Sequence, residues 1–244
     1  MELAEYHLMA EAEDRMWWYR AVRVRLVDAY SRWPGIKEKP LLDAGCGTGG
    51  QLARMSQEAP ERSLLGIDFA PVAARYASQK SGAPVAVASV NDLPFADESL
   101  GGLMSVDVLC HRMVDPARAL AEARRCLAPG GALIANLPAY QWMLSAHDHR
   151  VHNSRRFTPT SAREMFEQAG FVIREIRFWN SLLFPVMLLH RTLFDDKDAK
   201  SDVTSYPKFI EWLFGAILGF ERGLSCIGLF FPFGGSILVV AEKE

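Results

Sequence analysis

The chain has 244 residues, half of them hydrophobic, so it is long enough to bury a full core as one large domain or two small ones. Its formal net charge is -2 and no stripe of Lys and Arg appears, which excludes the electrostatic footprint of a nucleic-acid-binding protein. The four cysteines lie far apart without C-x-x-C spacing, as is typical of reduced thiols in the cytoplasm and unlike a disulfide scaffold or a zinc site.

The first 35 residues are expected to form a helical cap. Residues 1–6 are acidic and contain no apolar core of a signal peptide, so we expect a cytoplasmic protein. Residues 6–30 show helical spacing, with a cluster of three aromatic residues and an arginine at 17–20. These aromatic side chains either pack the helix onto a sheet or help to cover a bound ligand.

A glycine-rich segment follows, with the sequence LLDAGCGTGG at residues 41–50. A short apolar run ends in Asp43, a turn rich in glycine comes next, and helical spacing then resumes, so the segment predicts a strand, a tight loop and a helix start. Glycine has no Cβ and accepts positive φ angles. Gly45, Gly47 and Gly49 therefore allow a ligand to lie against bare backbone.

Asp43 distinguishes between a site for S-adenosylmethionine and a site for a nicotinamide dinucleotide. Gly45, Gly47 and Gly50 also fit the G-x-G-x-x-G fingerprint of dinucleotide sites. Asp43 would place a carboxylate beside the loop, where it would attract an ammonium or sulfonium group and repel a pyrophosphate. This favours S-adenosylmethionine over a nicotinamide dinucleotide.

On these residues the chain resembles the class I S-adenosylmethionine-dependent methyltransferases, in particular a bacterial methyltransferase type 11-like family. The resemblance covers residues 40–180 and the last strand. It implies that residues 36–244 form an α/β domain with a Rossmann-like, doubly wound, mostly parallel seven-stranded sheet and an antiparallel last strand. It also implies that the cap at 1–35 covers the cofactor, with Trp18 and Arg20 near the cofactor or the acceptor.

The second strand is predicted at residues 63–68 and ends in Asp68. In doubly wound folds a carboxylate at this spacing from the loop binds the ribose, since it accepts the protons of both hydroxyls. The alternative is a carboxylate that only caps the next helix. Phe69 follows and is expected to lie against the adenine.

Residues 84–95 resemble the family's third-strand segment, which ends in an acid-small-acid pattern before Leu-Pro-Phe. Here Ser89 occupies the first acid position, so the Ser89 hydroxyl and the Val90 amide are the candidate adenine partners. The Phe-Asp pair that commonly enters the family's fourth strand is replaced by Leu100 and Gly101. Both departures bear on the adenine pocket that the resemblance implies.

The fourth strand is predicted at residues 103–111, and open parallel sheets hold their reactive groups at the carboxyl ends of their strands. Asp107 is expected beside the cofactor, and His111 near the transferred methyl. An imidazole titrates near neutrality, so His111 is a candidate general base, with a structural role as the alternative. A helix at 116–127, a Pro-Gly-Gly turn and a fifth strand at 132–136 follow.

A polar loop is predicted at residues 140–158. His147 with Asp148 is expected to form an oriented base, and the two arginines near its end to hold an acceptor carboxylate or phosphate. The alternative is a hydrogen-bonded lid without chemistry. The histidines lack standard zinc spacing, so no metal is expected. The acceptor-binding residues predicted in this loop are Tyr140, His152, Arg155 and Arg156.

A sixth strand is predicted at residues 171–179 and an antiparallel seventh at 236–241. The insertion between them, at 180–233, contains apolar stretches at 182–189 and 209–231. Charged residues interrupt the second stretch, so two amphipathic or buried helices are predicted rather than a membrane span. We expect them to contact a membrane surface, form an apolar acceptor channel or make a homodimer interface, unless they only complete the core.

The chain is therefore expected to transfer the methyl group of S-adenosyl-L-methionine to a small-molecule, lipid-like acceptor. A small thiol or acid is the alternative acceptor, and a non-catalytic S-adenosylmethionine-binding protein is the alternative of a different class. Cofactor contacts are expected from Asp43, Gly45, Cys46, Gly47, Gly49, Asp68, Phe69, Ser89, Val90 and Asp107.

Overall fold

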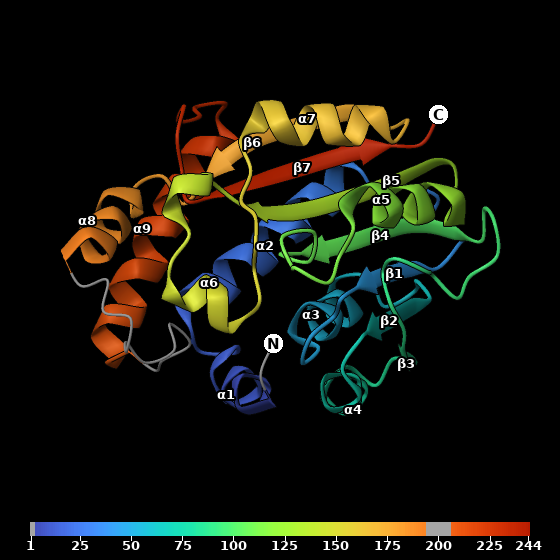
Figure 1. Ribbon diagram of the computed structural model, residues 1–244, viewed down its shortest axis with the longest axis horizontal. Helices are drawn as coiled ribbons and strands as arrows, with labels where there is room; N and C mark the ends of the chain where they lie inside the picture. Colours follow the sequence, from blue (N-terminus) through green and yellow to red (C-terminus); the bar gives the residue numbers. More distant parts are fainter. Residues whose placement is uncertain (1–2, 194–205) are drawn as a thin grey trace.

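The computed structural model describes residues 3–193 and 206–244, and the side chains of residues 3–4, 146–147 and 190–193 lie outside this description. The strands are Leu41–Ala44 (β1), Leu64–Asp68 (β2), Val85–Val87 (β3), Leu100–Val106 (β4), Leu127–Pro138 (β5), Val172–Trp179 (β6) and Ser236–Glu242 (β7). They form one seven-stranded sheet in the order β3-β2-β1-β4-β5-β7-β6 (Figure 1). Strands β1 to β5 pair in parallel, and β7 runs antiparallel to β5 and β6. This confirms the predicted doubly wound fold and its antiparallel last strand.

Helices cover both faces of the sheet (Figure 1). One apolar core lies between the sheet and α2 (Trp17–Arg32), α3 (Gly50–Glu58) and α9 (Lys208–Cys226). The other lies between the sheet and α5 (Pro116–Cys126) and α7 (Pro159–Gln168). The central strands are buried on both faces, which explains why their sequences are apolar runs rather than alternating patterns.

Side-chain caps fix the first turns of α5 and α7. The Asp115 carboxylate accepts hydrogen bonds from the backbone N–H groups of Ala117 (3.0 Å) and Arg118 (3.3 Å). At α7, Thr158 and Ser161 each accept a hydrogen bond from the other's backbone N–H. Proline follows each cap, where its fixed φ suits the first helical position, so both helices begin where the sequence places them.

Gly101 is required for packing at the start of β4. A Cβ at this position would lie 1.9 Å from the carbonyl oxygen of Ile36. The Gly101 N–H donates to the Pro40 carbonyl, and the Gly101 carbonyl accepts from the Ile36 N–H, both at 2.9 Å. The departure from the family pattern at this position therefore serves backbone-to-backbone packing, at the end of β4 opposite to the expected adenine pocket.

The fifth strand begins earlier than predicted. Leu127 pairs with Leu100, and the regular register with β4 resumes at the Gly102–Ala132 pair after an irregularity. The predicted Pro-Gly-Gly turn is thus part of β5. The Gly130 N–H donates to the Lys243 carbonyl, and the Lys243 N–H donates to the Gly131 carbonyl. These contacts to a distant part of the chain fix the stretch, and local turn residues do not indicate them.

The insertion forms α8 (Phe184–Leu193) and α9, as predicted for the region before the last strand. Glu221 of α9 is 2% exposed and accepts hydrogen bonds from the backbone N–H groups of Asn180 (2.7 Å) and Ser181 (2.8 Å). It also pairs with Arg25 of α2 at 3.1 Å. Within the described residues no helix is long and apolar enough to cross a membrane.

We predict that Glu221→Ala destabilises the protein by about 3 kcal/mol, because Arg25 is left as an uncompensated buried charge and backbone donors lose their acceptor. Chemical denaturation measures the change. The matched control is Glu167→Ala, which removes an exposed ion pair with Arg163 and should cost less than about 1 kcal/mol. Equal stability of the two variants would contradict the anchoring role of Glu221.

Candidate active site

The glycine loop between β1 and α3 is held against β2. The backbone N–H groups of Gly45 and Cys46 both donate to the Ile67 carbonyl at 2.9 Å. Gly45 has a φ of 81°, and a Cβ there would lie 2.4 Å from the Val108 side chain. Glycine at this position therefore satisfies both the turn geometry and the close approach of the loop after β4.

Asp68, the last residue of β2, closes this loop. Its carboxylate accepts hydrogen bonds from the N–H groups of Gly47 and Ala70, both at 2.9 Å. The second bond lies just before α4 (Pro71–Ser81), at the N–H of its N-cap residue Ala70, and α4 has no side-chain cap. Asp68 is 8% exposed, and burial raises the pKa of its carboxyl while the two N–H donors oppose that rise.

Asp43 carries a buried carboxylate oxygen that lacks a partner. The residue is 4% exposed, and its Oδ2 has no hydrogen-bond partner among the described residues. Burial, together with the nearby Asp68 and Glu13 carboxylates, raises the pKa of Asp43 to about 7. Because a buried polar atom normally has a partner, this oxygen fits a site for a cationic ligand group beside the loop.

Asp107 stands at the end of β4 in a polar chain that crosses the sheet. It has a φ of 52°, and its carboxylate accepts a hydrogen bond from Asn136 Nδ2 at 2.8 Å. Asn136 Oδ1 in turn accepts from Trp179 Nε1 at 2.8 Å. Burial raises the pKa of Asp107 to about 7. The carboxyl ends of β4, β5 and β6 are thereby joined by hydrogen bonds.

The amino-terminal helices lie over the glycine loop. The Met9 side chain of α1 (Leu3–Ala12) packs against Gly47, where an added Cβ would lie 2.7 Å from the Met9 methyl. Tyr6 of the same helix is close enough to Asp68 that burial and this carboxylate raise the pKa of the phenol to about 12. Residues of α1 therefore lie against the glycine loop, and the expectation that this cap covers the cofactor stays a prediction.

Glu13 connects the cap to the loop. It is 4% exposed and accepts a hydrogen bond from Thr48 Oγ1 at 2.7 Å. It also pairs with Arg23 at 2.7 Å and Lys80 at 2.5 Å. A Cβ at Gly50 would lie 1.8 Å from the Arg23 guanidinium and 2.3 Å from the Glu13 carboxylate, so a side chain there would displace this ion pair.

The arginine of α2 that reaches the loop is therefore Arg23, whereas the predicted Arg20 is exposed. One turn separates the two on the helix, and only the docking of α2 selects between them. Trp18 stacks on Trp179 with ring centroids 6.2 Å apart. This places Trp18 beside the polar chain from Asp107.

Aromatic rings gather at the carboxyl end of β5. Tyr140 has a φ of 62° and lies 5.4 Å from Trp142 and 5.4 Å from Phe178 between ring centroids. Phe184 at the start of α8 lies 5.5 Å from Tyr140 and 6.0 Å from Phe233. Trp142 is 62% exposed, so this group forms an apolar wall that reaches from the strand end to the surface.

Asp148 has a partner that the sequence did not indicate, and its expected pairing with His147 stays a prediction. Asp148 is 1% exposed and forms an ion pair with Arg156 at 2.8 Å, with a further hydrogen bond from the Ser145 N–H at 2.9 Å. The His147 side chain lies outside the described residues. A buried carboxylate needs a charged partner, and Arg156 provides it.

The two arginines of this segment also differ from the expectation that they bind an acceptor. Arg155 donates to the backbone carbonyls of Leu109 (3.1 Å) and Val114 (2.7 Å). Arg156 donates to the Ala139 carbonyl (3.2 Å) besides its pair with Asp148. Their guanidinium groups therefore hold the segment around α6 (Ala146–Arg150) against the ends of β4 and β5.

His111 and His152 lie in the same segment contact. His111 forms an isolated backbone bridge with Asn153, and the His152 carbonyl accepts from the Arg112 N–H at 2.8 Å. Burial lowers the pKa of His111 to about 4, so its imidazole is neutral at physiological pH. His152 has a φ of 61° and is partly buried.

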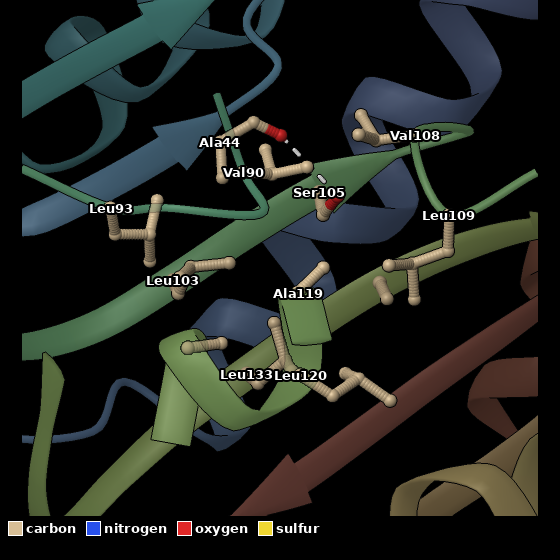
Figure 2. A pocket seen from close by; sticks show the side chains of 12 residues that line it. Ala44, Val90, Leu93, Leu103, Ser105, Val108, Leu109, Ala119, Leu120 and Leu133 are labelled. Atoms are coloured by element: carbon tan, nitrogen blue, oxygen red, sulfur yellow. Dashed lines mark hydrogen bonds between the residues drawn. The ribbon is translucent and has the colours of Figure 1, made fainter. Parts of the chain in front are cut away.

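The expected adenine residues follow β2 and β3 in the chain. Phe69 is 72% exposed, and the Ser89 hydroxyl accepts a hydrogen bond from the Asn91 N–H at 3.2 Å. Val90 lines an apolar cavity of about 20 Å³ beneath β1 and β4, together with Val108 and Leu109 (Figure 2). This volume is no larger than a water molecule needs, so the cavity is a packing gap and not a ligand pocket.

Sequence reasoning did not identify three residues of this region: Glu13, Arg23 and Asn136. Cys46, by contrast, was predicted in the loop and is there; it is 7% exposed, and burial raises the pKa of its thiol. A signal for Asn136 does exist. It is a polar residue at the end of an otherwise apolar strand, the position at which parallel sheets place functional groups.

Comparisons with known proteins agree with this geometry. A family model described as a methyltransferase domain matches residues 42–135. Malonyl-[acyl-carrier protein] O-methyltransferase from Dechloromonas aromatica is 30% identical over 167 residues, which cover 65% of this chain and 60% of that protein. Trans-aconitate 2-methyltransferase from Deinococcus radiodurans is 32% identical over 148 residues, covering 56% and 50%. The chain spans about half the length of the curated relatives it matches.

Solved structures share the fold. A methyltransferase from Thermotoga maritima, titled a possible histamine N-methyltransferase, has a TM-score of 0.60 and 18% identity, and the match covers 99% of this chain and 96% of that one. Geranyl diphosphate C-methyltransferase from Streptomyces coelicolor, solved with S-adenosyl-L-homocysteine, has a TM-score of 0.57 and 15% identity, with 91% and 77% covered.

We predict that the ligand-free protein gains stability from Asp43→Asn at high pH. A raised folded-state pKa means that ionised Asp43 opposes folding, and this cost grows as the pH rises from about 4 through 7. The advantage of the variant over the wild type should increase by about 2 kcal/mol between pH 5 and pH 8. Denaturant unfolding at both pH values measures it. Asp92→Asn, at an exposed position, is the control, and a pH-independent difference for Asp43→Asn would contradict the account.

Proposed function

We propose that this chain, which carries a class I S-adenosylmethionine-dependent methyltransferase domain, transfers the methyl group of S-adenosyl-L-methionine to a small, lipid-like acceptor. The observation that carries the proposal is the Asp43 carboxylate. It is buried, its Oδ2 lacks a partner within the described chain, and it stands beside a glycine loop that exposes backbone. A cationic ligand group would supply the missing partner and return the pKa of Asp43 to the range of an ionised carboxylate.

The residues around the loop fit the remaining parts of such a ligand. Asp68 would accept the two ribose hydroxyl protons with lone pairs that its two N–H donors leave free. Gly45 and Gly47 leave the backbone open to close approach, and Asp107 contributes a second buried carboxyl at the same strand edge. The further cofactor contacts that we propose are Cys46, Gly49, Phe69, Ser89 and Val90.

S-adenosyl-L-methionine, when bound, supplies a methyl group that its sulfonium has already activated. The residues of the chain therefore have to align the acceptor, exclude water and, for some acceptors, take one proton. The cap formed by α1 and α2 covers the loop and would exclude water. His111 is neutral at physiological pH, so its imidazole is able to accept a hydrogen bond from an acceptor, while its lowered pKa makes it a weak base.

The roles that we propose for the other predicted catalytic residues are indirect. Asp148 acts as a positioning residue, because its carboxylate holds Arg156 and through it the segment that carries His152. Arg155 positions the loop that ends in His111 in the same way, through the carbonyls of Leu109 and Val114. His147 stays a prediction.

The apolar wall of Tyr140, Trp142, Phe178 and Phe184 supports a lipid-like acceptor. It begins at the carboxyl end of β5, the same end of the sheet as the polar chain from Asp107, and it ends in the exposed Trp142 ring. The names of the relatives range from an acyl-carrier-protein substrate to trans-aconitate and geranyl diphosphate. The relatives therefore do not indicate one acceptor, and the proposal of a lipid-like acceptor is based on the side chains of this chain.

A small thiol or acid remains the second candidate acceptor, since histidines and arginines are concentrated between residues 140 and 158. Arg155 and Arg156 already have protein acceptors, which makes this candidate the weaker one. A non-catalytic S-adenosylmethionine-binding protein is the candidate of another class. Formation of S-adenosylhomocysteine that depends on an added acceptor separates an enzyme from a binding protein.

We predict that Asp43→Ala and Asp68→Ala each weaken the binding of S-adenosyl-L-methionine more than about tenfold, because each removes a charge-assisted interaction. Calorimetric titration measures the dissociation constants, and thermal melts show that both variants fold. Asp92→Ala, at an exposed position, is the matched carboxylate control and should bind like the wild type. Unchanged affinity in both test variants would remove the proposed roles of Asp43 and Asp68.

We also predict that Trp142→Ala lowers kcat/KM for dodecyl or farnesyl acceptors with a terminal hydroxyl or carboxyl by more than about fivefold, because the apolar tail loses an aromatic contact. The affinity for S-adenosyl-L-methionine should stay unchanged. The release of S-adenosylhomocysteine is the measured quantity, and Met113→Ala, at a similarly exposed apolar residue, is the control. Faster methylation of short thiols or acids than of these amphiphiles would favour the second candidate.

A further inference from the structure

The outward face of α9 is apolar over its whole length. Phe209 and Trp212 are each 65% exposed, Phe220 is 64% exposed and Ile227, just after the helix, is 73% exposed. Their spacing places them on one stripe of the helix. Leu229 and Phe230 extend the exposed surface beyond the helix end. We refer to the exposed side chains of Phe209, Trp212, Phe220, Ile227, Leu229 and Phe230 as the α9 face.

The charged side chains of α9 do not interrupt this face. Glu211 accepts a hydrogen bond from the Trp17 N–H at 2.6 Å, and Glu221 is buried in its pair with Arg25. Arg222 pairs with Asp28 of α2 at 2.6 Å. An ordinary surface helix turns its charges toward water and its apolar residues toward the core. In α9 these three charged groups are bound to the protein body, while large apolar rings point outward.

Phe209 and Trp212 stack with their ring centroids 6.2 Å apart, and Phe220 and Ile227 follow at separate positions along the helix. A Cβ added at Gly215, Gly219 or Gly223, which lie between them along the helix, would meet nothing within 4 Å. Three glycines in an exposed helix also disfavour the helix itself, and no contact within the described chain requires them. The face is thus a set of protruding rings with open space between them, not a flat surface.

We propose that the α9 face docks on the surface of a lipid bilayer, with its rings at the boundary between headgroups and acyl chains. A fluid lipid surface accommodates separate protruding rings, whereas a protein partner would need a matching socket for each. Aromatic residues are also the side chains that favour the membrane interface. Lys208, at the start of the helix, adds a cation next to Phe209 and Trp212, as is typical of helices that lie in that interface.

A second copy of this chain fits the α9 face less well. The helical stripe from Phe209 to Ile227 is about 27 Å long at 1.5 Å per residue and about 10 Å wide, or roughly 300 Å². A stable interface takes about 800 Å² from each partner. The stripe alone falls short of that area, so a dimer would also need the flanking apolar residues, whereas a bilayer sets no such lower limit for reversible contact.

The position of the face suits an amphiphilic acceptor. In Figure 1, α8 and α9 lie beyond the carboxyl ends of β4 and β5, the end of the molecule that carries the candidate active site. Ring contacts run from Tyr140 through Phe184 to Phe233 and Phe231, next to Phe230. The idea that an acceptor moves from the bilayer along these rings rests on the proposed function. The docking of the α9 face on the bilayer does not depend on that function.

Vesicle flotation of the full chain tests the docking. The probe is 100 nm vesicles of phosphatidylcholine and phosphatidylglycerol at three to one, without any methyl acceptor. The wild type should float with the vesicles and stay bound in 0.5 M salt, because apolar insertion dominates. Trp212→Glu and Phe220→Glu should each lower the bound fraction at least fivefold. Val87→Glu adds the same charge at an exposed apolar residue of β3 and should float like the wild type.

A second measurement locates the contact. Brominated phosphatidylcholine should quench part of the tryptophan fluorescence of the wild type, and Trp212→Phe should bind vesicles equally well but lose most of that quenching. Titration with S-adenosylhomocysteine, which does not involve α9, shows whether each variant is folded and tests the cofactor site separately. Failure of the wild type to float, equal flotation of the glutamate variants, or a stable wild-type dimer that Trp212→Glu dissociates would overturn the proposal.

Discussion

The concentration of buried carboxylates at one edge of the sheet is the physical constraint on which the rest of this structure depends. Parallel strands β1, β2 and β4 bring Asp43, Asp68 and Asp107 to the same edge, and Glu13 adds a fourth carboxylate from the cap. Like charges in a low dielectric repel each other and lose hydration, so each must be compensated or neutralised. The surrounding polar structure provides this compensation at three of the four positions. Asp43 is the exception.

The compensating groups explain features that otherwise look unrelated. Backbone N–H groups donate hydrogen bonds to Asp68, and these bonds fix the glycine loop. Asn136 donates to Asp107 and accepts from Trp179, which joins three strand ends. Arg23 and Lys80 serve Glu13 and draw the amino-terminal helices onto the loop. The cap is therefore docked by the same electrostatics that prepare the site. The one carboxylate oxygen left over, on Asp43, is where a cationic ligand would complete the arrangement.

Sequence patterns predicted the sheet, the glycine loop and the positions of Asp43, Asp68 and Asp107, because strand periodicity and strand ends are local properties. They did not identify Arg23, since Arg20 and Arg23 are one turn apart and the rotation of α2 is decided by its contact with α9. They did not indicate the buried ion pair between Asp148 and Arg156, which lie eight residues apart, and the predicted pairing of Asp148 with His147 stays a prediction. They also placed a turn inside β5, where pairing with β4 and contacts to Lys243 decide the conformation. Such choices depend on tertiary contacts that no local window contains.

The most direct test of the central claim is a calorimetric titration of the wild-type protein with S-adenosyl-L-methionine, S-adenosyl-L-homocysteine and NADH. The account predicts micromolar binding of the first two and no binding of NADH, because Asp43 would repel a pyrophosphate. Binding of NADH, or of none of the three, would contradict the assignment of the carboxylate edge as an S-adenosylmethionine site.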